Sequence, residues 1–149
     1  MWKYINFCII CVIINLNINT AFAHLHCEAS YQYAWAKKNN AVCEYKNDDG
    51  TRVDCLTKTH AIEFDFAKKW AEAIGQALYY QYKTGKRAKV ILILENPQKE
   101  MVYFNRVKAL SHIHNFDAEY ITPDILDLSN NNECHYTKCK CHRQKHINK

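Results

Sequence analysis

Apolar and polar positions divide the first part of the chain into a helix and a strand hairpin. In residues 27–40, Tyr31 and Trp35 recur at helical spacing among alanines, which predicts a helix that ends at two asparagines. Residues 41–46 and 51–57 have the period of strands, and "NDDG" between them has the composition of a hairpin turn. The pattern therefore predicts a helix followed by two antiparallel strands.

A third strand is predicted over residues 59–67, where apolar and polar positions alternate. Because consecutive side chains of a strand point to opposite faces of a sheet, Ile62 and Phe64 should lie on one face. Glu63 and Asp65 should then lie together on the other face. The strand is therefore expected to present two carboxylates on the same side of the sheet.

After this strand the period becomes helical. Residues 68–84 place apolar side chains on one broad stripe, and Gly85 is a suitable C-terminal stop for this helix. Residues 88–95 form a short, continuous apolar run, which is typical of a central strand buried on both faces. Residues 100–115 and 116–122 are interpreted as a further helix and a last strand.

The predicted order is helix, three strands, helix, strand, helix, strand. A strand meander followed by a β-α-β crossover predicts the α/β class, with a mixed sheet and helices on both of its faces. The length of 149 residues favours one domain.

The N-terminus has the layout of a secretory signal peptide. Lys3 precedes an apolar run over residues 5–14, and small residues, Ala21 and Ala23, stand where a signal peptidase requires them. The apolar run is shorter than the roughly 20 residues of a membrane span, although an uncleaved anchor is the alternative. We therefore predict a signal peptide at 1–23, export to a periplasm or out of the cell, and no stable membrane association after cleavage.

Two regions follow the signal peptide: a domain over 24–124 and a Cys-rich basic tail over 125–149. Six cysteines lie outside the signal peptide, and an even number in a small exported chain is typical of disulfides. They are Cys27, Cys43, Cys55, Cys134, Cys139 and Cys141. Zinc binding by the tail is the alternative, and the exported compartment favours disulfides.

The pairing of these cysteines stays open, because six cysteines allow 15 connectivities. Cys55 follows Asp54 directly, so its side chain should point to the other face of the strand. A disulfide from Cys55 to either Cys27 or Cys43 would fix the strand that carries Asp54.

The formal net charge of +5 suits a polyanionic partner, although many basic proteins bind nothing acidic. The acids carry more specific information. Asp54 lies near the end of the second predicted strand, and Glu63 and Asp65 lie on the third, so pairing of these strands would bring three carboxylates together. Oxygen ligands of this kind suit Mg²⁺ or Mn²⁺, which can polarise a phosphate and activate water. A single carboxylate on a strand is more often only a solvated side chain.

A polar ridge on the following helix could face these acids. Each helical residue advances by about 100°, so Lys69, Glu72, Gln76 and Tyr80 fall on one ridge. Lys68 lies roughly 80° away from Gln76 by the same geometry. A lysine beside the carboxylates could stabilise negative charge on a phosphate, whereas the alternative interpretation of the ridge is a solvated helix face.

These residues resemble the motifs of the PD-(D/E)XK nuclease superfamily, and more narrowly of its RecB-type, Holliday-junction-resolvase-like branch. The resemblance covers roughly residues 27–122 and implies an αβββαβ restriction-endonuclease-like core. It places the Asp and Glu of the family on Asp54 and Glu63, and the QxxxY motif of the branch on Gln76 and Tyr80. It also implies Glu28, on the first helix, as a further metal ligand.

The chain departs from this family at one position, because the lysine of the Glu-x-Lys motif would fall on Asp65. In one interpretation the lysine has moved to the helix, as Lys69 or Lys68, and Asp65 is an extra metal ligand. In the other, the site is degenerate and the protein binds nucleic acid without cutting it. His60 is a candidate general base, although a single histidine is more often a hydrogen-bonded residue.

The function that the resemblance implies is that of an exported, Mg²⁺- or Mn²⁺-dependent nuclease acting on nucleic acid, with DNA favoured. A homodimer is expected if both strands are cut. The alternatives are a non-catalytic nucleic-acid-binding module on the same fold and a small disulfide-rich secreted protein that binds another protein.

Overall fold

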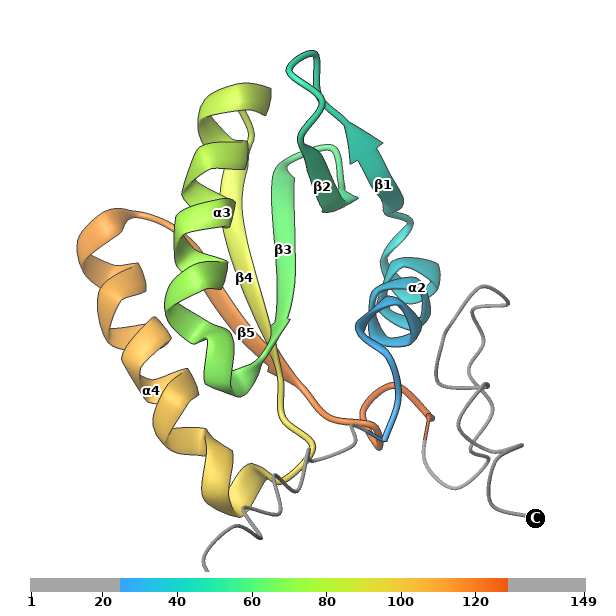
Figure 1. Ribbon diagram of the computed structural model, residues 1–149, viewed down its shortest axis with the longest axis vertical. Helices are drawn as coiled ribbons and strands as arrows, with labels where there is room; N and C mark the ends of the chain where they lie inside the picture. The colour runs from blue at the N-terminus through green and yellow to red at the C-terminus, as the bar shows by residue number, and fades with distance from the viewer. Residues whose placement is uncertain (1–24, 129–149) are drawn as a thin grey trace, which may run out of the picture.

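The computed structural model describes residues 25–128 and contains a five-stranded mixed sheet with three α-helices packed on it (Figure 1). The elements run along the chain as α2 (Glu28–Asn39), β1 (Val42–Lys46), β2 (Arg52–Leu56), β3 (His60–Phe66), the 3₁₀ turn η1 (Ala67–Lys69), α3 (Trp70–Thr84), β4 (Arg87–Ile93), α4 (Pro97–His114) and β5 (Asp117–Ile121). The predicted signal peptide at 1–23 and the tail residues 129–149 lie outside the described residues.

The strands follow one another across the sheet in the order β1-β2-β3-β4-β5. The pairs β1–β2 and β2–β3 are antiparallel, whereas β3–β4 and β4–β5 are parallel. Short turns are sufficient for antiparallel neighbours, but parallel neighbours need a crossover, which α3 and α4 provide. The predicted α/β class, with a mixed sheet flanked by helices, is confirmed.

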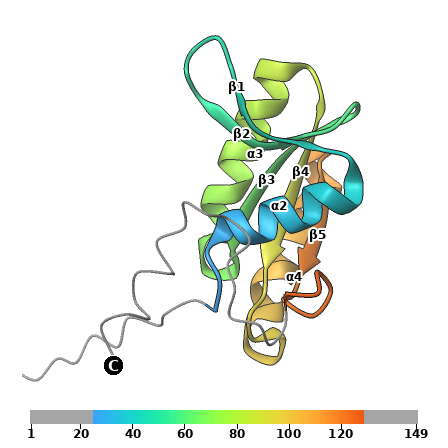
Figure 2. The same cartoon turned by 90° about the vertical axis from the view of Figure 1, so that its right-hand side faces the viewer.

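Helices cover both faces of the sheet. In Figure 1, α3 and α4 lie on one side and α2 on the other, and Figure 2 shows α2 crossing the sheet. Tyr31 and Trp35 of α2 pack into one apolar core, which also holds Ile62 and Phe64 of β3. The predicted alternation of β3 is confirmed, because the face with Ile62 and Phe64 packs against α2.

The central strand β4 contributes to the cores on both faces. Ile91 and Ile93 belong to the core under α2, whereas Val90 and Leu92 belong to the core under α3 and α4. All four side chains are buried, and each contributes roughly 1.5–3 kcal/mol by leaving water. This burial on both faces confirms the interpretation of the continuous apolar run.

The core under α2 is completed by residues that the sequence pattern assigned to the tail. Leu126 and Leu128 are buried and pack with Trp35 and Ile121. No helix within residues 25–128 is both long and apolar enough to cross a membrane.

Candidate functional site

A pocket with a volume of about 340 Å³ opens where α2, β2, β3, η1 and α3 meet. The residues that line it come from all of these elements and from the hairpin turn. They are Glu28, Thr51, Arg52, Asp54, Glu63, Asp65, Lys69, Gln76 and Tyr80. Seven of the eight predicted site residues are among them, and the exception is Lys68.

Asp54 reaches the pocket where β2 and β3 part. The two strands pair through Leu56↔Ala61 and Cys55↔Ile62. Beyond these pairs, the backbone N–H of Phe64 donates to Oδ2 of Asp54 at 2.8 Å. The side chain of Asp54 thus takes a hydrogen bond that a strand neighbour would otherwise receive, and this contact fixes the carboxylate beside β3.

Glu63 is buried next to Asp54, and the two carboxyl groups share a hydrogen bond. Burial is the main cause that raises the pKa of Glu63, and the charges of Asp54 and Glu28 raise it further. Burial also raises the pKa of Asp54, against the opposing effect of the Phe64 hydrogen bond. Among the described residues, Oε2 of Glu63 has no hydrogen-bond partner. A buried oxygen without a partner is costly, so this position suits a positively charged ligand.

Asp65 and Lys69 line the pocket beside Asp54 and Glu63. Asp65 is buried, and its Oδ1 accepts the N–H of Phe66 at 2.8 Å and lies 3.6 Å from Nζ of Lys69. Burial raises the pKa of Asp65, although Lys69 opposes this shift, and Asp65 in turn raises the pKa of Lys69. The ammonium group of Lys69 therefore lies at the carboxylate pocket, on a side chain that is 57% exposed and can reach a bound ligand.

Glu28 brings a fourth carboxylate from the first turn of α2. Nε2 of Gln32, one turn later, donates to its Oε1 at 3.0 Å and orients it. The pKa of Glu28 is raised to about 8, first by burial and then by the charges of Asp54 and Asp65. The charges of Asp54 and Asp65 thus raise the pKa of both Glu28 and Glu63 through like-charge repulsion.

The helical ridge closes the pocket through Gln76 and Tyr80. The hydroxyl of Tyr80 donates to Oε1 of Gln76 at 3.4 Å, and Nε2 of Gln76 donates to Oε1 of Glu72 at 3.2 Å. Burial, followed by the charge of Glu63, raises the pKa of Tyr80 to about 12, so this phenol keeps its proton at neutral pH and can donate a hydrogen bond.

Two lining residues, Thr51 and Arg52, are missing from the sequence prediction. Arg52 lies two positions before Asp54, so strand alternation could have placed both on one face. Its Nε is 2.8 Å from Oε2 of Glu44 on β1, and Glu44 has a left-handed backbone with a φ of 60°. Such a φ is uncommon for a residue other than glycine, and Glu44 stands opposite the strand segment that carries Asp54.

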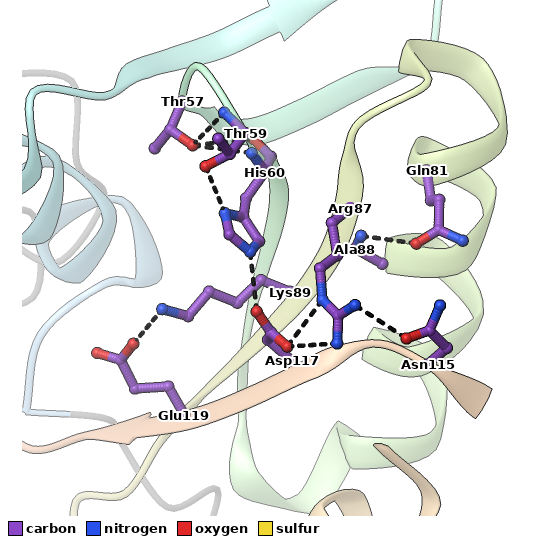
Figure 3. Close-up of polar contacts among 10 residues, drawn as sticks. All are labelled: Thr57, Thr59, His60, Gln81, Arg87, Ala88, Lys89, Asn115, Asp117 and Glu119. Carbon is purple, nitrogen blue, oxygen red and sulfur yellow. Dashed lines mark hydrogen bonds and ion pairs between the residues drawn. The ribbon is translucent and has the colours of Figure 1, made fainter. Parts of the chain in front are cut away.

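His60 lies outside this pocket. Its Nε2 is 2.8 Å from Oδ2 of Asp117, and its Nδ1 is 2.8 Å from Oγ1 of Thr59 (Figure 3). With both ring nitrogens engaged there, His60 is a hydrogen-bonded residue at the start of β3 and does not face the carboxylates.

The chemistry of the pocket fits a divalent cation. Its carboxylates offer hard oxygen donors, and an added positive charge would remove their mutual repulsion and satisfy Oε2 of Glu63. Within residues 25–128, however, no three His, Cys, Asp or Glu side chains form a group set to hold a metal ion. The pocket is therefore a set of suitable donors rather than a closed coordination sphere. Comparisons of the chain with protein-family models, curated proteins and solved structures find no match.

Proposed function

We propose that this protein is a metal-dependent nuclease that hydrolyses phosphodiester bonds in nucleic acid, with DNA as the first candidate substrate. The observation that carries the proposal is the gathering of four carboxylates, one lysine and a Gln–Tyr pair around one pocket. The order αβββαβ of the elements from α2 to β4 agrees with the core of the PD-(D/E)XK superfamily, which the motifs resemble. We propose the same restriction-endonuclease-like core for this chain.

In this proposal the carboxylates hold Mg²⁺ or Mn²⁺. Asp54 and Glu63 are the main ligands, and Asp65 and Glu28 lie at the same pocket to assist. When bound, the ion polarises the phosphate and lowers the pKa of water. Such an ion would need the ionised forms of these carboxylates and would favour them over the protonated forms.

The cationic and helical residues position the phosphate. Lys69 lies beside Asp65 with an exposed ammonium group, so it can stabilise the negative charge that develops on the phosphate. Gln76 and Tyr80 are linked by a hydrogen bond and can orient the bound strand or the ligands of the ion. Lys69, and not Lys68, is therefore the proposed substitute for the lysine that the family carries at the position of Asp65.

A plasmid-nicking assay with Mg²⁺ or Mn²⁺ tests this proposal. Cleavage by the full-length chain should disappear in Asp54→Ala and in Glu63→Ala, with a loss of about 100-fold to 1,000-fold, because each change removes an essential charge-stabilising group. Thermal unfolding of each variant shows that the fold is retained. Cleavage that survives both substitutions would refute the site.

Asp65 at the usual lysine position favours one second candidate, a nucleic-acid-binding module that does not cut. Salt-dependent DNA binding without cleavage in any divalent metal would establish this candidate in place of the nuclease. Export of the mature chain and pairing into a homodimer also remain proposals, and size-exclusion chromatography with light scattering tests the dimer.

A further inference from the structure

Two cysteines face each other across the hairpin that carries Asp54. Cys43 on β1 and Cys55 on β2 are direct partners in the antiparallel pairing of these strands. Directly opposed residues in such a pair have Cα atoms about 4.5 or 5.5 Å apart, and both distances lie within the range of about 4.4–6.8 Å that a disulfide spans. The backbone is therefore already placed for a covalent bond.

The side chains are also directed toward each other. Both cysteines are thiols in this structure, with Sγ atoms 2.9 Å apart. A disulfide bond is about 2.05 Å long, so closure needs a movement of roughly 0.9 Å. The backbone carbonyl of Gln32 on α2 lies 3.8 Å from each sulfur and holds the pair against the helix that carries Glu28.

We propose that Cys43 and Cys55 form a disulfide that fixes β1 to β2 and thereby holds Asp54 in the pocket. Cys55 is the residue next to Asp54, and Cys43 is next to Glu44, whose carboxylate pairs with the pocket residue Arg52. Cys27, the remaining described cysteine, instead lies with its Sγ 3.2 Å from Oγ of Ser30. The geometry thus selects one of the two partners that the sequence leaves open for Cys55.

The oxidation is a two-electron exchange with a small-molecule disulfide such as oxidised glutathione. Half-buried Cys43 is the accessible sulfur; its thiolate attacks the oxidant, forms a mixed disulfide and releases one thiol. Buried Cys55 then attacks the sulfur of Cys43 and releases the second thiol. Two S–H bonds are lost, one S–S bond forms, and the two protons and two electrons leave with the reduced oxidant.

Peptide mapping of the full-length chain tests the bond without reference to metal or activity. The chain is equilibrated with reduced and oxidised glutathione, alkylated in denaturant so that buried thiols react, and digested with trypsin, which cleaves after Lys46 and Arg52 and so separates the two cysteines. The expected product joins peptide 39–46 to peptide 53–58 and disappears on reduction. Cys27→Ser should keep this product, whereas Cys43→Ser should lose it and leave Cys55 open to alkylation. Alkylation of both Cys43 and Cys55 before reduction, or linkage of either to another cysteine, overturns the proposal.

Thermal unfolding gives the second readout. Reduction should lower the Tm of the oxidised chain by roughly 10 °C, because the bond closes a short loop in the unfolded state. The Tm of Cys43→Ser should respond to the reductant by roughly 10 °C less than that of the wild-type chain. A linked pair with an unchanged Tm would contradict the claim that the bond fixes the hairpin.

The effect on cleavage rests on the proposed function. Reduction should weaken metal-dependent nicking by the wild-type chain and leave that of Cys43→Ser unchanged. If the linked peptides are found and no condition gives cleavage, the disulfide stands and the nuclease proposal fails. If cleavage occurs and the peptides are never linked, the nuclease stands and the disulfide fails.

Discussion

The charged side chains at the two ends of β3 differ in how their charges are balanced. At the start of the strand, His60 and Arg87 both contact Asp117, and Arg87 also donates to Oδ1 of Asn115, so that negative and positive groups are matched (Figure 3). Toward the other end, Glu63 and Asp65 gather with further carboxylates in a pocket. The first cluster is complete within the protein, whereas the second has an excess of negative charge.

The pKa shifts show the same contrast. Burial alone would raise the pKa of Asp117, but the hydrogen bonds from Arg87 and His60 outweigh it and lower the pKa below its usual range. For Glu63, burial and the neighbouring carboxylates act in the same direction and raise the pKa. A cluster that stabilises the fold pairs its charges within the protein. A cluster suited to a cation keeps an excess of negative charge, which the ligand would neutralise.

The largest expected effect tests which lysine serves the pocket. Lys69→Met should reduce metal-dependent nicking by about 100-fold, because it removes the cation beside the bound phosphate. Lys68→Met is the matched control: it lies next along the chain but does not line the pocket, and should change the rate by no more than about threefold. Equal losses in both variants would mean that the lysines act through general attraction of nucleic acid.

The next largest expected effect is the pH dependence of the free energy of unfolding, which arises from the excess of carboxylates in the pocket. The folded chain holds a proton on Glu28 up to a pKa of about 8, whereas the unfolded chain loses it near the ordinary value of 4.5. The folded state therefore binds more protons between these values, so the free energy of unfolding of the metal-free chain should fall as pH rises through this window, by more than about 1 kcal/mol. Chemical denaturation at pH 5 and pH 8 measures this change.

Two controls sharpen the pH experiment. Glu28→Gln should reduce the pH dependence, because the amide cannot ionise, and the part that remains belongs to the raised pKa values of Asp54, Glu63 and Asp65. Mg²⁺ should raise the Tm more at pH 8 than at pH 5, since protons compete with the ion for the carboxylates. An equal Tm shift at both pH values would show that the ion binds elsewhere.

The smallest expected effect comes from a substitution in the cluster around Asp117, where the charges are matched. Asp117 is partly exposed, so Asp117→Asn should lower the free energy of unfolding by about 1 kcal/mol or less and leave nicking unchanged. Because the pKa of Asp117 is lowered, the stabilisation from its ionised form is present above the ordinary value of 3.8 and is lost as pH falls through the lower folded value. Denaturation curves of wild type and variant should therefore converge in acid, and a difference that persists there would point to packing.

The sequence was most informative where one element fixes the geometry. Alternation along β3 is sufficient to place Glu63 and Asp65 on one face, and the helical period is sufficient to align Gln76 with Tyr80. The same helical period placed Lys69 on the ridge and Lys68 off it, and Lys69 is the one of the two that lines the pocket, although both lie in a 3₁₀ turn with about three residues per turn instead of 3.6.

Features that depend on contacts between helices and strands could not be predicted from the periodicity of apolar residues in the sequence. The position of Glu28 depends on how α2 crosses the sheet, and the family resemblance alone indicated it. Leu126 and Leu128 stand in a segment without periodicity, and only their packing against α2 and β5 makes them part of the core. The parting of β2 from β3 depends on a side chain, Asp54, that accepts a backbone hydrogen bond.

That last contact limits how position 54 can change in evolution. Asp54 supplies an acceptor to the N–H of Phe64 as well as a charge to the pocket. Loss of the whole side chain would leave a backbone donor without its partner, a cost of about 1–3 kcal/mol that any lineage would bear even after abandoning the chemistry. Asparagine keeps the acceptor and discards the charge, so under the proposed function a descendant that has lost metal binding should carry Asn at this position more often than an apolar residue.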